Sequence, residues 1–289
     1  MQYIFATDLH GNISQYRKLL EFVSDNKVDV VFLGGDLWPK EGGRWYPENE
    51  VRTVHAQEAF IKDFFLQYIE ELAENAEVFY ILGNDDFAIT QRLLEHNNER
   101  VHYLNGSKSF RWKGYMVIGY PYVGLTPYLQ KDWESWDDFE GTVHKNYITQ
   151  GYHSTDSGHV PADYMKPPLN SKYIADDLDT LFGDLRGELV IAVFHEAPYG
   201  RMLDVTHESN SYLGSMHLGS KSLIRAIQKY QPVISFHGHI HESFQESRRY
   251  WEQVGDTLMF NPGNGLDDNE ISFIYGSLDN PDDHERITI

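Results

Sequence analysis

The sequence predicts an α/β protein built around a buried sheet. Short runs of β-branched and aromatic residues alternate with stretches whose apolar residues recur at helical spacing, which is the pattern of repeated β-α-β units. The chain has 289 residues, of which 41% are hydrophobic and 14% aromatic, enough to bury a sizeable core. Together these two observations predict a folded, globular α/β chain.

The first part of the chain carries the clearest signals. The predicted order is strand 3–7, helix 13–25, strand 28–35, helix 53–74, strand 77–83, helix 88–97 and short strands at 101–104 and 115–120. Asn12 precedes the first helix and is predicted to cap it.

The second part repeats this pattern after an interruption. A helix at 171–183, a strand at 188–194, a helix at 220–230 and a strand at 232–236 are predicted, followed by "TLMFNPG" and "ISFIYGSL", which alternate like antiparallel strands. Regularity fails between Val123 and Asn170, where Tyr, Trp, Asp, His, Gly and Pro are frequent. The aromatic residues argue against simple disorder, so we interpret 123–170 as a cap-like insertion in a single domain spanning 1–289.

Composition excludes several partners. The formal net charge is -20, from 44 acidic and 24 basic residues, so duplex nucleic acid is not an expected ligand. No run approaches the roughly 20 apolar residues of a membrane span, and no leader peptide precedes the first strand, so we expect a cytoplasmic protein. Cysteine is absent, so any metal must be held by His, Asp, Glu or Asn.

Polar residues follow five of the predicted strands. They are Asp8 and His10 in "FATDLHGN", Asp36 in "FLGGDLW", Asn84 and Asp85 in "YILGNDD", His195 in "VFHEAP", and His239 and His241 in "HGHIHE". Each alone reads as a turn, a helix cap or a packed histidine. Because the carboxyl ends of strands in an open α/β sheet form the ligand crevice, their joint occurrence predicts one shared site.

The donor set predicts a metal site. Two aspartates, four histidines and one asparagine suit Mn²⁺ or Fe, with Zn²⁺ as a further candidate. Seven ligands are too many for one such ion with room for water. Two divalent metal ions roughly 3.5 to 4 Å apart, bridged by a carboxylate, would use them all.

The order Asp-x-His, Gly-Asp, Gly-Asn, His and Gly-His-x-His, from Asp8 to His241, resembles the calcineurin-like metallophosphoesterase superfamily. The resemblance implies a four-layer α/β/β/α sandwich of two mixed β-sheets flanked by helices. It also implies that a metal-bridging hydroxide attacks phosphorus. The implied ligands are Asp8, His10 and His241 on one metal, Asn84, His195 and His239 on the other, and Asp36 bridging both. The segments "HLGS", "GHIHES" and "NPG" further resemble a prokaryotic branch of small stand-alone phosphoesterases.

One position departs from the family pattern. Many members carry a histidine directly after Gly-Asn, whereas this chain has Asp85 there. An aspartate beside two divalent cations is a poor proton donor at neutral pH, and it repels a phosphomonoester dianion more than a diester monoanion. We therefore take Asp85 as a candidate catalytic residue that favours diesters. The alternative is that Asp85 caps a helix beginning near Phe87.

Other residues are weaker candidates. His217 is the second predicted catalytic residue, since it and His207 follow the His195 strand in a Gly- and Ser-rich connection where either could contact phosphate. Since Asp85 is a poor proton donor, another residue would have to protonate the leaving group. Candidates for this role are His144, His153 and His159 in the insertion. Trp38, Tyr120 and Tyr122 are candidates for stacking on a nucleobase or for ordinary packing. His237 is interpreted as a packing or supporting residue.

The function predicted from these residues is a binuclear metal-dependent phosphoesterase. A small phosphoester is the expected substrate, with nucleotide-derived diesters among the candidates. Phosphomonoesterase activity at the same site is one alternative. A non-catalytic protein-binding scaffold is another, but such scaffolds tend to lose ligands and this chain keeps all seven.

Overall fold

The computed structural model describes residues 1–40, 47–137, 149–155, 158–164, 173–183, 185–211, 214–264 and 269–289. The elements of its first part are β1 (Gln2–Ala6), α1 (Ile13–Asp25), β2 (Val30–Gly34), α2 (Pro47–Phe60), a π-helical turn η1 (Ile61–Phe65), α3 (Leu66–Asn75), β3 (Glu77–Ile81), a 3₁₀ helix η2 (Ala88–Leu93), β4 (Val101–Tyr103), β5 (Ser109–Trp112) and β6 (Tyr115–Tyr120). Those of its second part are β7 (Gln150–Thr155), β8 (Gly158–Asp163), α5 (Ile174–Gly183), β9 (Leu189–Phe194), η3 (Glu208–Asn210), α6 (Lys221–Tyr230), β10 (Ile234–Phe236), α7 (Ser243–Ser247), β11 (Trp251–Val254), β12 (Thr257–Phe260), β13 (Ser272–Ser277) and β14 (His284–Thr288).

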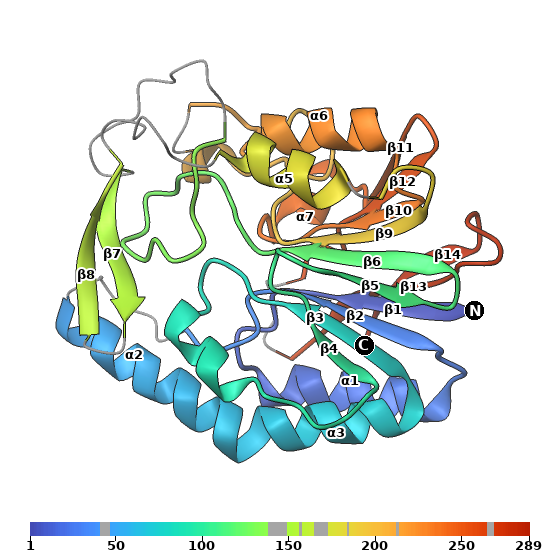
Figure 1. Cartoon of the computed structure of the whole chain (residues 1–289), viewed down its shortest axis with the longest axis horizontal. Helices are drawn as coiled ribbons and strands as arrows, with labels where there is room; N and C mark the ends of the chain where they lie inside the picture. The colour runs from blue at the N-terminus through green and yellow to red at the C-terminus, as the bar shows by residue number, and fades with distance from the viewer. Residues whose placement is uncertain are drawn as a thin grey trace.

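Two six-stranded sheets stack face to face. Their strand orders are β14-β13-β1-β2-β3-β4 and β11-β12-β10-β9-β6-β5. Helices α1, α2 and α3 cover the outer face of the first sheet, and α5 and α6 cover the second (Figure 1). The predicted four-layer α/β/β/α sandwich of two mixed sheets is therefore confirmed.

Side-chain alternation explains the layers. Along β1, Ile4 and Ala6 belong to the core beneath the helices, whereas Tyr3 and Phe5 face the second sheet. There the ring centroids of Tyr3 and Phe5 lie 5.3 and 4.7 Å from that of Phe236. Both faces of each sheet are thus buried, as the nearly continuous apolar strands require.

The central strands of each sheet run parallel. β1, β2, β3 and β4 pair in parallel, as do β6, β9, β10 and β12. The predicted antiparallel pairing is confirmed for β13 against β1. For β12 the prediction is only partly correct, because this strand pairs antiparallel with β11 but parallel with β10. The carboxyl ends of the central strands consequently meet on one side of the molecule.

Two predicted helices differ in detail. Helix 53–74 is part of a longer helical stretch, Pro47–Asn75, that contains the π-helical turn. The helix expected at 88–97 is a short 3₁₀ helix, Ala88–Leu93. The Thr90 hydroxyl and the Thr90 N–H both donate to the Phe87 carbonyl, and this local bonding favours i→i−3 over α-helical pairing.

The first part of the 123–170 insertion is attached to both sheets. On the side of the first sheet, Asp132 accepts from the Ala88 N–H at 2.8 Å, and the Trp133 indole donates to the Asp86 carbonyl at 2.7 Å. On the other side, Asp137 accepts from the Lys221 N–H at 2.8 Å, at the start of α6. The segment from Val123 to Asp137 therefore bridges the two halves.

The remaining described part of the insertion is the β7–β8 hairpin, which lies at the left of the molecule in Figure 1. Within the ranges given above, no helix is both long enough and apolar enough to cross a lipid bilayer.

Candidate metal centre

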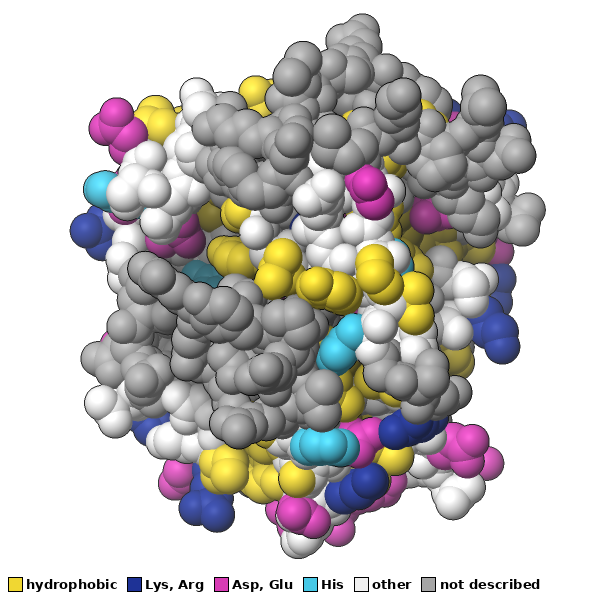
Figure 2. Space-filling model, turned by 90° about the vertical axis from the view of Figure 1, so that its left-hand side faces the viewer, with side chains coloured by type: hydrophobic (Ala, Val, Ile, Leu, Met, Phe, Trp, Pro, Cys, Tyr) yellow, Lys and Arg dark blue, Asp and Glu magenta, His cyan; other side chains and the backbone are white. Residues whose placement is uncertain are grey.

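The loops that follow β1, β2, β3, β9 and β10 converge at the carboxyl ends of the parallel strands. This is the left-hand side of Figure 1, and Figure 2 shows histidine side chains and a band of hydrophobic side chains near the middle of that face. The topology thus brings together side chains as far apart in the sequence as Asp8 and His241.

Four of these residues form a compact group. Asp8, His10, Asp36 and His241 each offer a ligand atom, and these atoms all lie within 4.8 Å of one another. His10 Nε2 is 3.4 Å from His241 Nε2, and His241 Nε2 is 3.5 Å from Asp8 Oδ1. The arrangement could hold one metal ion.

A second group lies on the other side of Asp36. His195 Nε2 is 3.0 Å from Asn84 Oδ1 and 3.4 Å from Asp36 Oδ2, and the His195 and His239 ring centroids are 5.4 Å apart. Asp36 Oδ2 is also 4.0 Å from His10 Nε2. The Asp36 carboxylate therefore lies between the two groups.

The orientation of His195 is set by the neighbouring strand. Its Nδ1 lies 2.8 Å from the carbonyl oxygen of Gly34, to which an Nδ1–H donates, so Nε2 points at Asn84 and Asp36. A hydrogen bond from the second ring nitrogen to a backbone carbonyl is typical of metal-binding histidines.

The protonation of the group also suits a cation. Burial lowers the pKa of His10 and of His241, and burial together with the nearby His195 holds the pKa of His239 well below its usual range. Burial alone would also lower the pKa of His195. The Asp36 carboxylate outweighs this effect and raises the pKa of His195 to about 10. Without metal, His195 and Asp36 thus form an ion pair whose proton an arriving cation would displace.

Backbone strain concentrates here. Asp8, His10, Asp36 and His239 have positive φ angles of 57°, 44°, 51° and 64°. In the described ranges only three other non-glycine residues do: Lys113, Gln231 and Arg248. Such conformations persist where surrounding structure imposes them, often at functional sites.

Buried atoms in the site lack partners. Asp8 Oδ2 and His10 Nδ1 are buried, and within the described residues neither of them has a hydrogen-bond partner. An unsatisfied buried carboxylate oxygen is costly. Oxygen and imidazole donors that a cation would satisfy are the set that Mn²⁺, Fe and Zn²⁺ accept, so the residues fit such an ion.

The loop after β3 is held by its second aspartate. The buried Asp86 carboxylate accepts from the N–H groups of Gly83, Leu37 and Trp38 at 2.8, 3.1 and 2.8 Å. It joins the β2 and β3 loops and so fixes Asp36 relative to Asn84.

Two asparagines hold the loops after β1 and β10. Asn261, in the "NPG" segment, donates to the Gly238 carbonyl at 3.4 Å, and Asn264 donates to the Asp8 carbonyl at 3.1 Å. Gly238 itself leaves little space, since an added Cβ would lie 2.3 Å from Thr7 Oγ1 and 2.8 Å from Asp8 Oδ2.

Asp85 lies beside the first group and does not cap a helix. The N-cap of η2 is Phe87, with no side-chain hydrogen bond, so the capping alternative is wrong. Asp85 Oδ2 is 3.9 Å from His10 Nδ1 and 2.5 Å from Lys40 Nζ, while its N–H donates to Asp36 Oδ1 at 2.8 Å. The N–H groups of Ala88 and Ile89, which a capping side chain would bind, donate to the side chains of Asp132 and Ser154 instead.

His217 forms a dyad outside the compact group. Its Nδ1 is 2.7 Å from the buried Asp204 carboxylate, which also accepts from the N–H groups of Gly200, Arg201 and Gly219. This arrangement leaves Nε2 as the ring nitrogen not bound to Asp204, and 33% of the side chain is exposed. The exposed His207 bonds locally with Ser209 instead.

The histidines of the insertion have partners of their own. His153 lies 3.2 Å from the Tyr164 hydroxyl and 3.7 Å from Asp132, and His159 packs against Phe87. His144 falls outside the described residues.

The remaining aromatic candidates are packing residues. Trp38 and Tyr120 are buried, and Tyr122 packs between Tyr120 and Trp133, so the nucleobase-stacking alternative is not supported. His237 is buried with both ring nitrogens engaged, one by the Glu196 carbonyl and one by Ser235, in agreement with a supporting role. Asn12 caps α1 as expected, accepting from the Ser14 and Gln15 N–H groups.

Sequence reasoning missed Lys40 and Tyr128. Lys40 lies four residues after Asp36 in "GDLWPK", and its ammonium is 4.8 Å from the centre of the Tyr128 ring. A lysine shortly after a ligand loop is a weak signal, and a tyrosine inside an irregular insertion carries none.

Fold and site together define a class: an α/β/β/α sandwich with an Asp- and His-rich centre at the carboxyl ends of its parallel strands. The chain belongs to the calcineurin-like phosphoesterase family, whose model matches residues 1–243. That family is metal-dependent, and the cluster described above could bind metal.

Solved structures agree with this fold. One aligns over 100% of this chain and 98% of its own length at 16% identity with a TM-score of 0.62, and the protein TT1561 of Thermus thermophilus aligns over 100% and 97% at 16% identity with a TM-score of 0.57. An archaeal phosphodiesterase also aligns over 100% of both chains at 14% identity, but its TM-score of 0.46 is too low to support the fold assignment. No curated protein matches the chain in sequence.

Proposed function

We propose that this chain is a binuclear metal-dependent phosphodiesterase. The observation that carries the proposal is the position of Asp36, whose Oδ2 lies 3.4 Å from His195 Nε2 and 4.0 Å from His10 Nε2. One carboxylate between two groups of ligands is what two neighbouring cations need as a bridge.

Each side chain has a proposed role. Asp8, His10 and His241 hold one divalent ion, Asn84, His195 and His239 hold the other, and Asp36 bridges them. When bound, such a pair supplies Lewis acidity that neutralises phosphoryl charge and activates water. We propose Mn²⁺ or Fe as the preferred ions, with Zn²⁺ as a further candidate.

The remaining roles concern charge and protons. Asp85 places a buried carboxylate 3.9 Å from His10, where it would repel a monoester dianion more than a diester monoanion. His217, oriented by Asp204, is the proposed proton donor to the leaving group. We treat 1–289 as one domain, with 123–170 as a cap over the site.

A monoesterase is the second candidate, and a specific contact favours it. Lys40 pairs with Asp85, so the two side chains together bear no net charge. This pairing reduces the repulsion of a dianion and makes the preference between ester types a matter for measurement.

The test compares two chromogenic esters on the same preparation. Protein purified without chelator and loaded with Mn²⁺ is expected to contain about two transition-metal ions per chain, and to hydrolyse bis-p-nitrophenyl phosphate faster than p-nitrophenyl phosphate. Faster hydrolysis of the monoester would select the phosphatase. Less than one bound ion per chain, with no turnover of either ester, would select the non-catalytic scaffold.

A further inference from the structure

Lys40 is a cation at the edge of the acidic metal centre. Its Nζ lies 2.5 Å from Asp85 Oδ2 and 4.8 Å from the centre of the Tyr128 ring. The carboxylate comes from the β3 loop and the ring from the insertion, so three separate segments place the ammonium.

The two charges of this pair differ in accessibility. The Asp85 side chain is 4% exposed, whereas that of Lys40 is 32% exposed. Of the two side chains, that of Lys40 is therefore the one accessible to a molecule arriving from solvent. The buried Asp85 carboxylate orients the Lys40 ammonium through the ion pair.

Lys40 is also close to the proposed metal ligands, through Asp85. Asp85 Oδ2, which the Lys40 ammonium contacts, lies 3.9 Å from His10 Nδ1. The Asp85 N–H donates to Asp36 Oδ1 at 2.8 Å, so the pair adjoins the carboxylate that lies between the two groups. Tyr128, which is 36% exposed, forms the neighbouring wall.

The positive charge of Lys40 would help an anionic substrate to bind at this acidic site. The chain has a net charge of -20, and the centre contains three buried carboxylates, Asp8, Asp36 and Asp85, which disfavour an anionic substrate. Lysine is a good ligand for phosphate oxygens because its compact ammonium donates several hydrogen bonds.

We propose that Lys40 is a substrate-binding residue, whose ammonium, held by Asp85 and Tyr128, binds a non-bridging phosphoryl oxygen at the mouth of the metal centre. The inference rests on the proposed function and adds the residue that binds the substrate anion. Asp85 is then a positioning residue for Lys40, in a place where many family members carry a histidine.

The test measures binding of inorganic phosphate to Mn²⁺-loaded protein by titration calorimetry, with KM for bis-p-nitrophenyl phosphate and metal content on the same samples. Lys40→Met is expected to weaken phosphate binding by about tenfold or more, as loss of a charged hydrogen bond does, with metal content unchanged. Lys40→Arg is expected to restore most of the binding.

The double variant Lys40→Met/Asp85→Asn separates direct binding from simple neutralisation of Asp85. If Lys40 contacts the phosphate, the double variant stays weak; recovery of wild-type binding would overturn the proposal. So would wild-type phosphate affinity in Lys40→Met, or no phosphate binding by the metal-loaded wild type.

Lys229→Met is the matched control and should bind phosphate like the wild type. It removes another lysine paired with an aspartate and placed 4.8 Å from a tyrosine ring, away from the centre. Failure of the proposed function would appear separately, as a wild type without metal and without turnover.

Discussion

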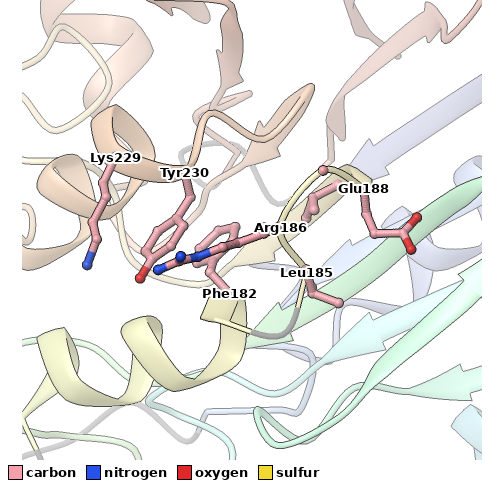
Figure 3. Close-up of a pocket in the computed structure, with 8 residues that line it drawn as sticks. Phe182, Leu185, Arg186, Glu188, Lys229 and Tyr230 are labelled. Carbon is pink, nitrogen blue, oxygen red and sulfur yellow. The ribbon is translucent and has the colours of Figure 1, made fainter.

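Lysine, aspartate and tyrosine meet at opposite ends of the sandwich, with different consequences: once at the carboxyl ends of parallel strands of the first sheet, and once where β9 of the second sheet begins. At the carboxyl end, Lys40 pairs with Asp85 and lies 4.8 Å from the Tyr128 ring. At the other end, where β9 begins, Lys229 pairs with Asp179 at 2.9 Å and lies 4.8 Å from the Tyr230 ring. Lys229 and Tyr230 line a cavity of about 300 Å³ between the end of α6 and the connection from α5 to β9 (Figure 3).

Burial separates these two sets. The Lys229 and Asp179 side chains are 53% and 56% exposed, whereas Asp85 is 4% exposed and adjoins the candidate metal centre. Water and salt screen the outer pair, so its contribution to stability is small. The inner pair acts in a poorly screened environment, where it sets the position of a charge.

The largest expected effect is at the bridging carboxylate. Asp36→Asn should lower metal affinity by more than about 100-fold and abolish turnover, because one charge is proposed to serve both ions. Metal content by mass spectrometry of the purified protein checks this. Asp179→Asn, at the other end, should keep both metal and activity. An active Asp36→Asn protein would contradict the two-ion assignment.

A third ion pair extends the comparison to full burial. Lys131 and Glu134 in the insertion are 0% and 1% exposed, with Nζ 2.7 Å from Oε2. Lys131→Met should destabilise the fold by about 3 to 5 kcal/mol, because it strands a buried carboxylate. Chemical denaturation measures this, and Lys229→Met should leave the midpoint unchanged. Equal denaturation midpoints for the wild type, Lys131→Met and Lys229→Met would show that burial does not determine how much each ion pair contributes to stability.

The same pair predicts a pH dependence with a definite sign. Burial, only partly offset by Lys131, raises the pKa of Glu134 to about 7 from its ordinary value of 4.5. The folded state therefore holds this proton more tightly than the unfolded state does. Stability from this group is present below about pH 4.5 and is lost as the pH rises to about 7. Glu134→Gln should flatten this part of the stability profile.

The smallest expected effect comes from adding one methyl group by a glycine-to-alanine substitution, once beside the candidate metal centre and once at the other end of the molecule. Gly238→Ala should destabilise the protein by about 1 to 3 kcal/mol and weaken metal binding, because its Cβ would collide with Thr7 and Asp8. Gly183→Ala, at the end of α5 with nothing within 4 Å of the added atom, should be neutral or slightly stabilising. Thermal unfolding with and without Mn²⁺ compares them. Equal metal affinities would show that the Gly238 loop can adjust.

Much of this protein was determined by local patterns in the sequence. Apolar runs such as "VVFLG" specify buried strands because both faces of the sheet are covered. The residues that follow those strands could be predicted to lie together because parallel strands end at a common edge. The order of these motifs sufficed to identify the family that the family model confirms.

Only the tertiary structure decided what lies next to what. The capping role considered for Asp85 was reasonable from the sequence, but Asp132, which lies 47 positions later, takes the N–H of Ala88 instead, and Lys40 takes the carboxylate. The pairing of β12 with β10 and the position of Tyr128 are likewise set by long-range contacts. Strand and motif signals are local properties of the chain, whereas burial and ion pairing depend on segments that meet only when the sheets stack.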